Sequence, residues 1–259
     1  MSGLAISCIL LGLQGCATAP SASEEVRRTL APTGKMRIAV LPGAPSSMVR
    51  EPVTGTIRGV AVEVGSELAR RLGVEYQLIE FGSFADVVAA LTSGRADLAA
   101  FNASSAQAVN VLLSPPLYSV ESGYLVPPGS RIQSIADIDT VNLRVGVQQN
   151  STSQRTLTGL LKNATIVPVA ILETVPDLLK QGRLDAFATN KAILFDTSDR
   201  LPGSKVLDGR YSIEHQSIAI PKGREAASDF MQEFIRDVLR SGLVAGAAGR
   251  ARLRGYVIQ

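Results

Sequence analysis

The chain has 259 residues, of which 46% are hydrophobic and 19% are charged. This composition supports one or two folded domains with a buried core and is unlike that of a disordered chain. The formal charge of +3 is too small for a nucleic-acid-binding surface, so we predict no nucleic-acid partner. The only cysteines are Cys8 and Cys16, and there is a single histidine. We therefore predict no metal site, no cofactor and no catalytic thiol.

The N-terminus carries an apolar stretch of ten residues, Leu4 to Leu13. It is too short to span a bilayer, which takes about 20 residues, and it has the length of a signal-peptide core. The sequence Leu-Gln-Gly-Cys that ends at Cys16 resembles the cleavage site of a bacterial lipoprotein. Residues 1–16 are thus predicted to be a signal peptide, Cys16 to carry the lipid, and residues 17–34 to be a flexible linker.

This interpretation predicts an exported protein, held by its lipid anchor in the periplasm or on the outer face of the cytoplasmic membrane. A disordered apolar N-terminus stays open as the alternative, because residues 1–16 contain no Lys or Arg.

The next segments read as alternating strands and helices. Lys35–Val40 is a short apolar run bounded by Pro42 and Gly43, which is typical of a buried strand. A helix follows that ends at Gly73, because apolar residues recur every four positions: Val60, Val64, Leu68 and Leu72. Tyr76–Phe81 is then predicted to be a strand.

One pattern occurs twice further along the chain. Ser83–Phe101 contains a capping residue, a helix, the sequence Gly-Arg-Ala-Asp and an apolar strand, and Thr174–Ala188 has the same order with Gly-Arg-Leu-Asp. Each copy opens with a Ser/Thr-x-x-Asp capping signal and each helix is predicted to end at its glycine. Further elements are a strand at Leu143–Val147 and a helix over about 225–240. This order predicts α/β lobes with parallel sheets covered by helices.

Two strand-like segments are predicted to cross between the lobes. Tyr124–Val126 precedes Pro-Pro-Gly, and Ser217–Ile220 precedes Pro-Lys-Gly. Two connections between lobes suit hinge closure over a ligand.

Together these features resemble the bacterial extracellular solute-binding proteins of family 3, the receptors of polar amino-acid ABC importers. The resemblance covers about residues 35–256 and rests on five segments: Gly59–Glu63, Leu91–Asp97, Leu113–Tyr118, Val145–Gln148 and Gly182–Ala186. It implies the α/β fold of type II periplasmic binding proteins, with two mainly parallel sheets flanked by helices and a double-crossing hinge. Lobe 1 would comprise residues 35–122 plus 223–259, and lobe 2 would comprise 123–222.

The resemblance also implies where a ligand binds. The arginine that holds an α-carboxylate in the family falls on Gln107, and the acid that receives an α-ammonium falls on Asn190. The hydroxyl pair that caps the carboxylate is retained as Ser151 and Thr152, next to Asn150. Asn102 takes a position that is usually Ser or Thr.

For several of these residues, and for two phenylalanines, a purely structural role remains open as the alternative to ligand binding. Phe101 and Phe187 end strands where a ligand would stack, or they belong to the core. Gln107 fits a solvated helix, and Ser151 and Thr152 fit plain helix caps.

Both charged anchors are therefore amides in this chain. A charge-assisted hydrogen bond contributes about 1.5–3 kcal/mol, and an amide lacks that contribution. We expect zwitterionic amino acids to bind weakly and a neutral polar or singly charged solute to be preferred.

The predicted function is that of a monomeric solute-binding receptor, without catalytic residues, that closes its lobes over a small polar organic solute and delivers it to an ABC permease. An enzyme such as cyclohexadienyl dehydratase, which arose on the same scaffold, is one alternative. A ligand sensor for a membrane signalling partner is another. His215 is predicted to be a surface or hinge residue, since it and Glu214 are strand neighbours that point to opposite faces.

Overall fold

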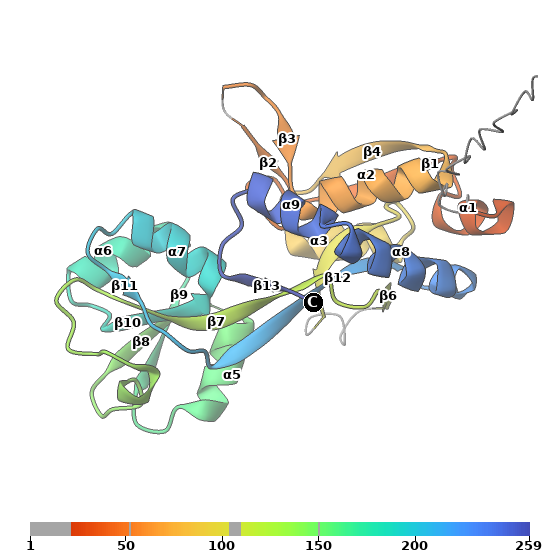
Figure 1. Ribbon diagram of the computed structural model, residues 1–259. Coiled ribbons are helices and arrows are strands. Elements are labelled where there is room, and N and C mark those ends of the chain that lie inside the picture. Colours follow the sequence, from red (N-terminus) through yellow and green to blue (C-terminus); the bar gives the residue numbers. More distant parts are fainter. Residues whose placement is uncertain (1–21, 52, 104–109, 150) are drawn as a thin grey trace, which may run out of the picture.

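The computed structural model describes residues 22–51, 53–103, 110–149 and 151–259. They form two lobes joined by long strands (Figure 1). Lobe 1 contains α1 (Glu24–Leu30), β1 (Lys35–Val40), β2 (Val49–Arg50), β3 (Ile57–Arg58), α2 (Val60–Leu72), β4 (Glu75–Glu80), α3 (Phe84–Thr92), β5 (Ala99–Asn102), β6 (Val111–Leu113), α8 (Ser228–Arg240) and α9 (Leu243–Arg250). Lobe 2 contains β8 (Arg144–Gln148), α5 (Thr152–Leu160), β9 (Thr165–Val169), α6 (Val175–Lys180), β10 (Ala186–Asn190), α7 (Lys191–Asp199) and β11 (Lys205–Val206).

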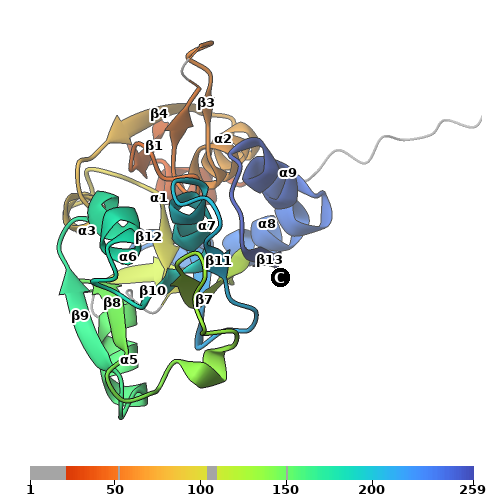
Figure 2. The same cartoon turned by 90° about the vertical axis from the view of Figure 1, so that its left-hand side faces the viewer.

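Two long antiparallel strands, β7 (Tyr118–Val126) and β12 (Ser212–Pro221), connect the lobes. In lobe 1, β12 pairs with β5 and β6, and in lobe 2, β7 pairs with β10. The central strands of lobe 2 are parallel, in the order β10-β8-β9, and β1 and β4 of lobe 1 are parallel as well. Figure 2 shows β9, β8, β10 and β7 side by side. The predicted α/β class with two lobes is confirmed.

The prediction of two mainly parallel sheets is not met. Among the described residues, the crossing strands join β5 and β6 of lobe 1 to β10, β8 and β9 of lobe 2 in one nine-stranded sheet, whose pairings are mostly antiparallel, and β1 and β4 form a separate parallel pair. The long crossing strands run antiparallel to each other, which makes this sheet mixed.

Most predicted elements lie within one or two residues of their predicted ends. The strand at Lys35–Val40 has the predicted limits, and the helix from Val60 ends before Gly73, whose φ of +67° places it in the left-handed region. The helices of the two repeats also end before left-handed glycines, Gly94 with φ +70° and Gly182 with φ +63°. Local turn and capping signals thus predicted the ends of these helices correctly.

The sheet of lobe 2 is covered on both faces, as Figures 1 and 2 show for α5 on one side and α6 and α7 on the other. On one face Val145 of β8 packs with Leu157 of α5. On the other face Phe187 of β10 packs with Leu179 of α6 and Leu194 of α7. Phe187 is fully buried in this core, which decides between its two possible roles.

The segment 17–34 is not a flexible linker throughout, because residues Glu24–Leu30 form α1. The Val26 backbone N–H donates to the Ser23 Oγ at 3.2 Å, which caps the helix. Acidic residues lie in its first turn and basic residues in its last, as the helix dipole favours. Leu30 is 1% exposed and belongs to the core of lobe 1. This burial gives a short helix the tertiary support that it needs.

The second predicted capping signal is wrong. Ser83 caps α3 by accepting from the Asp86 N–H at 3.2 Å. Thr174 makes no such bond, and its hydroxyl donates instead to the Ile171 carbonyl at 2.7 Å. The physical reason is that a 3-10 turn over Leu172–Thr174 runs directly into α6, so Thr174 already has helical backbone angles.

The Gly-Arg-x-Asp sequences form a matched pair of ion pairs. In lobe 1, Asp97 accepts from the Arg37 backbone N–H at 3.0 Å and from its guanidinium at 2.8 Å. In lobe 2, Asp185 accepts from the Arg144 backbone N–H at 2.8 Å and from its guanidinium at 2.9 Å. Each aspartate thereby ties the turn after a helix to the start of a strand, which is a structural role.

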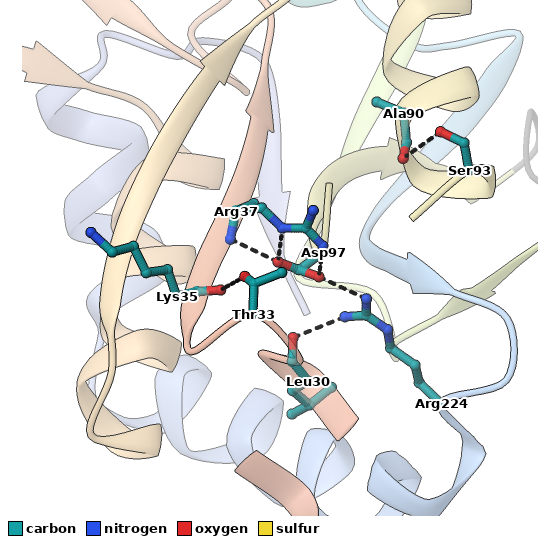
Figure 3. A network of polar contacts seen from close by, with 8 residues as sticks. All are labelled: Leu30, Thr33, Lys35, Arg37, Ala90, Ser93, Asp97 and Arg224. Atoms are coloured by element: carbon teal, nitrogen blue, oxygen red, sulfur yellow. Dashed lines mark hydrogen bonds and ion pairs between the residues drawn. The ribbon is translucent and has the colours of Figure 1, made fainter. Parts of the chain in front are cut away.

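Lobe 1 extends this arrangement with a second arginine (Figure 3). Arg224, which follows β12, donates to Asp97 at 2.7 Å and to the Leu30 carbonyl at 2.8 Å. The network therefore also fixes the C-terminal end of α1 to lobe 1.

The C-terminal segment makes a third connection between the lobes. After α9, the Arg254 Nη2 forms ion pairs with the Asp196 Oδ1 at 2.8 Å and the Asp199 Oδ2 at 2.7 Å, both in α7. Strand β13 (Tyr256–Ile258) then pairs antiparallel with β7. The predicted double crossing is thus reinforced by a third strand beside the first.

Candidate binding site

A buried carboxylate lies where the crossing strands meet. Glu214 of β12 is 9% exposed. The Asn102 Nδ2 of β5 donates to its Oε2 at 3.0 Å, and the Ser122 Oγ of β7 donates to its Oε1 at 3.3 Å. Asn102 belongs to lobe 1, whereas Glu214 and Ser122 belong to the connecting strands. The cluster therefore lies at the junction of the lobes.

Strand register places the three side chains of this cluster and that of Asn190 on one face of the sheet. Gln216 pairs with Asn102, and it lies two residues from Glu214 on the same strand. Ser122 pairs with Ser212 of β12 on one side and with Asn190 of β10 on the other. Residues directly opposite each other share a face, as do residues two apart. The side chains of Asn102, Glu214, Ser122 and Asn190 therefore belong to one polar row that runs from lobe 1 into lobe 2.

Tyr211 connects this row to the helix α5. Its hydroxyl donates to the Ser153 Oγ at 2.8 Å, and its backbone N–H donates to the Ser122 carbonyl at 2.9 Å. Its ring packs against Tyr124, with ring centroids 5.0 Å apart. Burial raises the pKa of the Tyr211 hydroxyl to about 12, so the group stays a neutral hydrogen-bond donor at physiological pH.

Burial also raises the pKa of Glu214 above its ordinary value, and the hydrogen bonds from Ser122 and Asn102 oppose this shift. The charged form of Glu214 is thus only partly compensated by its neutral neighbours.

The structure brings together some of the predicted site residues. Asn102 contacts Glu214, and Asn190 lies in the same polar row. The Asn190 Oδ1 accepts from the Ile193 N–H at 3.1 Å and thereby caps α7. Because Asn190 is an amide, it carries no negative charge, and its oxygen is already used by the helix.

The predicted hydroxyl pair lies at the start of α5. Ser151 caps this helix, because its Oγ accepts from the Gln154 N–H at 3.1 Å. The Thr152 Oγ1 accepts from the Arg155 Nη2 at 3.2 Å. The plain capping role thus accounts for Ser151. Phe101 lies in β5, but its side chain, like Gln107 and Asn150, lies outside the described part of the structure.

The residues that sequence reasoning missed are Glu214, Ser122 and Tyr211. The signal for Glu214 was the alternation in Ser-Ile-Glu-His-Gln, which predicts that Glu214 and His215 lie on opposite faces. His215 is indeed exposed, and its Nδ1 is 2.8 Å from the Ser119 Oγ. The same alternation turns Glu214 inward, toward residues of β5 and β7 that cannot be identified without the strand pairing.

The described residues were compared with the requirements of a membrane span and of a metal site. None of the helices there is long and apolar enough to cross a membrane. No group of three or more His, Cys, Asp or Glu side chains in that part of the chain is placed to hold a metal ion.

Replacing Glu214 with glutamine is expected to stabilise the ligand-free protein by about 1 kcal/mol at pH 7, because an incompletely compensated buried charge is removed while its neighbours keep partners. A folded-state pKa above the unfolded value favours the folded state at low pH, and that stability is lost as pH rises through the folded pKa. The advantage of the variant should therefore shrink on acidification toward the ordinary pKa of glutamate. Tyr211 is the titratable group beside Glu214, and it stays neutral throughout.

Thermal unfolding between pH 4 and pH 8 measures this effect. Glu121→Gln is the matched control, since Glu121 is the neighbour of Ser122 on β7 and forms ion pairs with Lys191 at 2.7 Å and Arg210 at 2.6 Å. These partners lower the pKa of Glu121, so the same substitution there should destabilise the protein. A loss of stability in Glu214→Gln at pH 7 would contradict the prediction.

Two α/β lobes, crossed by paired strands with a polar row between them, define the class of two-lobed solute-binding proteins. The sequence matches the bacterial extracellular solute-binding proteins, family 3, over residues 36–248. The chain belongs to this family.

Relatives and solved structures agree with this assignment. The chain is 25% identical over 199 residues to a protein of Neisseria gonorrhoeae named "Probable histidine-binding protein", covering 73% of this chain and 72% of that one. The fold of the present chain is similar to that of a binding component of an ABC transporter from Wolinella succinogenes, complexed with lysine. The TM-score is 0.70 at 19% identity, covering 84% of this chain and 95% of that one.

An ancestral amino acid-binding protein, described as a precursor of cyclohexadienyl dehydratase, has a TM-score of 0.67 at 19% identity, covering 86% of this chain and 98% of that one. At these identities the solved structures show the shared fold.

Proposed function

We propose that the protein is the solute-binding receptor of an ABC importer and that it closes its lobes over a small polar, amino-acid-like solute. The observation that carries this proposal is the polar row of Asn102, Glu214, Ser122 and Asn190, which spans both lobes at their junction. A solute that contacts both lobes binds the closed form more tightly and so shifts the population toward it. The closed form is then presented to a permease. The related proteins named for histidine and complexed with lysine support an amino-acid-like solute.

The proposal includes export and a lipid anchor at Cys16, a monomeric state, and lobe limits at 35–122 plus 223–259 and 123–222. Membership of an extracellular family supports export. The anchor rests on the sequence around Cys16, which lies outside the described residues. The lobe limits stay a prediction. The predicted boundary between residues 122 and 123 falls inside strand β7.

One observation favours a second candidate function. Glu214 is a buried carboxyl group with a raised pKa, which is the kind of group that a general acid or base needs. The ancestral protein described as a precursor of cyclohexadienyl dehydratase shares the fold. Incubation of the purified protein with prephenate or arogenate tests this candidate. We expect no steady conversion, and turnover that Glu214→Gln abolishes would establish the enzyme instead.

A thermal-shift screen tests the receptor. The protein is first unfolded in guanidinium and refolded, so that any co-purified solute is removed, and is then screened against amino acids, opines, carboxylates and amines. At a concentration of 100 times Kd a solute adds about 2.7 kcal/mol, which raises Tm by about 5–10 °C for a chain of this size. We expect such a shift from at least one class and smaller shifts from amino acids whose side chains are uncharged or acidic. The absence of a shift from every class would overturn the proposed function.

A further inference from the structure

Glu214 has no cationic partner among the residues that the structure describes. The two acids buried there are Glu214 and Asp97. Asp97 is bonded to both Arg37 and Arg224. Glu214 has only the neutral donors of Asn102 and Ser122, and no ion pair within 4.0 Å joins it to a described Lys or Arg. Buried carboxylates are ordinarily paired, because desolvation of an uncompensated charge is costly. Within the described part of the chain, this carboxylate therefore lacks its counter-charge.

The place of Glu214 indicates where that counter-charge comes from. The carboxylate lies in the polar row at the junction of the lobes, and Asn102 and Ser122 hold its two oxygens from neighbouring strands. At the other end of the row Asn190 is neutral, and its oxygen is occupied by the Ile193 N–H. The negative charge of this row is thus on β12 and not at the start of α7.

We propose that Glu214 binds a cationic group of the solute, an ammonium or a comparable charged nitrogen, and restricts the receptor to solutes that carry one. This inference rests on the proposed function. Asn102 and Ser122 are positioning residues, since they orient the carboxylate before the solute arrives and keep their hydrogen bonds once it has bound. The resulting ligand class is a small amine or guanidine, with or without a carboxylate, and excludes simple anions. The solute cation completes a charge pair that the described part of the protein leaves incomplete, which makes the interaction specific for positive charge.

Calorimetric titration of three proteins tests this assignment: the refolded wild type, Glu214→Gln and Glu121→Gln. The cationic probes carry a net positive charge at pH 7: L-lysine, L-arginine, cadaverine, agmatine and histamine. The anionic probes are succinate and glutarate. Glu121→Gln removes the same charge from the neighbouring strand, but Glu121 is paired with Lys191 and Arg210.

We expect at least one cationic probe to bind the wild type and neither anion to do so. Glu214→Gln should weaken binding of that probe by about 10- to 100-fold, as loss of a charged hydrogen bond predicts, whereas Glu121→Gln should change it less than about twofold. The thermal unfolding midpoint of each variant shows that it is folded.

Different results overturn different statements. If every solute found by the broad screen lacks a charged nitrogen, or if Glu214→Gln binds a solute with a charged nitrogen as well as the wild type does, the assignment of Glu214 is wrong and the receptor function stands. If no solute of any class binds, the proposed function itself fails.

Discussion

Replacing Asp97 with asparagine is expected to lower the free energy of unfolding by about 3–5 kcal/mol, the range measured when one partner of a buried ion pair is removed. Asp97 is 1% exposed and accepts from Arg37 and Arg224 (Figure 3). Asparagine keeps the shape but has one acceptor oxygen in place of two and no charge. The guanidinium of Arg224, whose side chain is 10% exposed, would then be buried with only the Leu30 carbonyl as a strong partner.

The second repeat supplies the matched control. Asp185 makes the same contacts with Arg144, but no second arginine among the described residues pairs with it, and the two side chains are 32% and 42% exposed. Asp185→Asn should therefore cost about 1 kcal/mol or less, as for other exposed pairs. Urea unfolding at pH 7 measures both variants. Equal losses would mean that burial and the Arg224 link do not set the strength of this contact.

Replacing Gly59 with alanine is expected to cost about 2–6 kcal/mol, because a strained backbone conformation costs about 1–3 kcal/mol and overpacking about 1–3 kcal/mol more. Gly59 has φ +144° and ψ 147° directly before α2, a region that only glycine occupies readily. A Cβ there would lie 2.1 Å from the Ser47 carbonyl oxygen. The adjoining Pro45 and Ser46 carbonyls accept from the first N–H groups of α2 at 3.3 and 3.1 Å, so the loop cannot retreat without losing these bonds.

Gly43→Ala separates the two causes. Gly43 also has a positive φ, +85°, but a Cβ there would meet nothing within 4 Å. Its expected cost is about 1–2 kcal/mol, from backbone conformation alone. Thermal and urea unfolding of both variants give the comparison. If Gly59→Ala is no more destabilised than Gly43→Ala, the close approach of Ser47 does not constrain this turn.

The limits of most elements follow from local signals. The period of the apolar residues predicts α2, and left-handed glycines predict where α2, α3 and α6 end. The same reasoning would have predicted α1, since Ser23 precedes two glutamates and then two arginines. It was wrong at Thr174, where a preceding 3-10 turn supplies the helical conformation that a cap would otherwise begin.

The candidate site was predictable only in part. The resemblance to the family indicated Asn102 and Asn190, which do lie in one polar row. It did not indicate Glu214, because the acid of the family aligns with Asn190 and no local signal links Glu214 to the strands beside it. Ser151 caps α5, and its contact with a ligand stays a prediction.

The sequence by itself determined the α/β class and the repeated helix–turn–strand units, because periodicity, capping residues and glycines act over a few neighbouring positions. Its composition alone showed that cysteine and histidine are scarce. Only the tertiary structure decided which charges are paired. Asp97 meets Arg37 from 60 positions away and Arg224 from 127, and Glu214 meets Asn102 from 112 and Ser122 from 92. Contacts at such separations depend on strand pairing and burial, and a sequence pattern with a period of two or four residues carries no information about them.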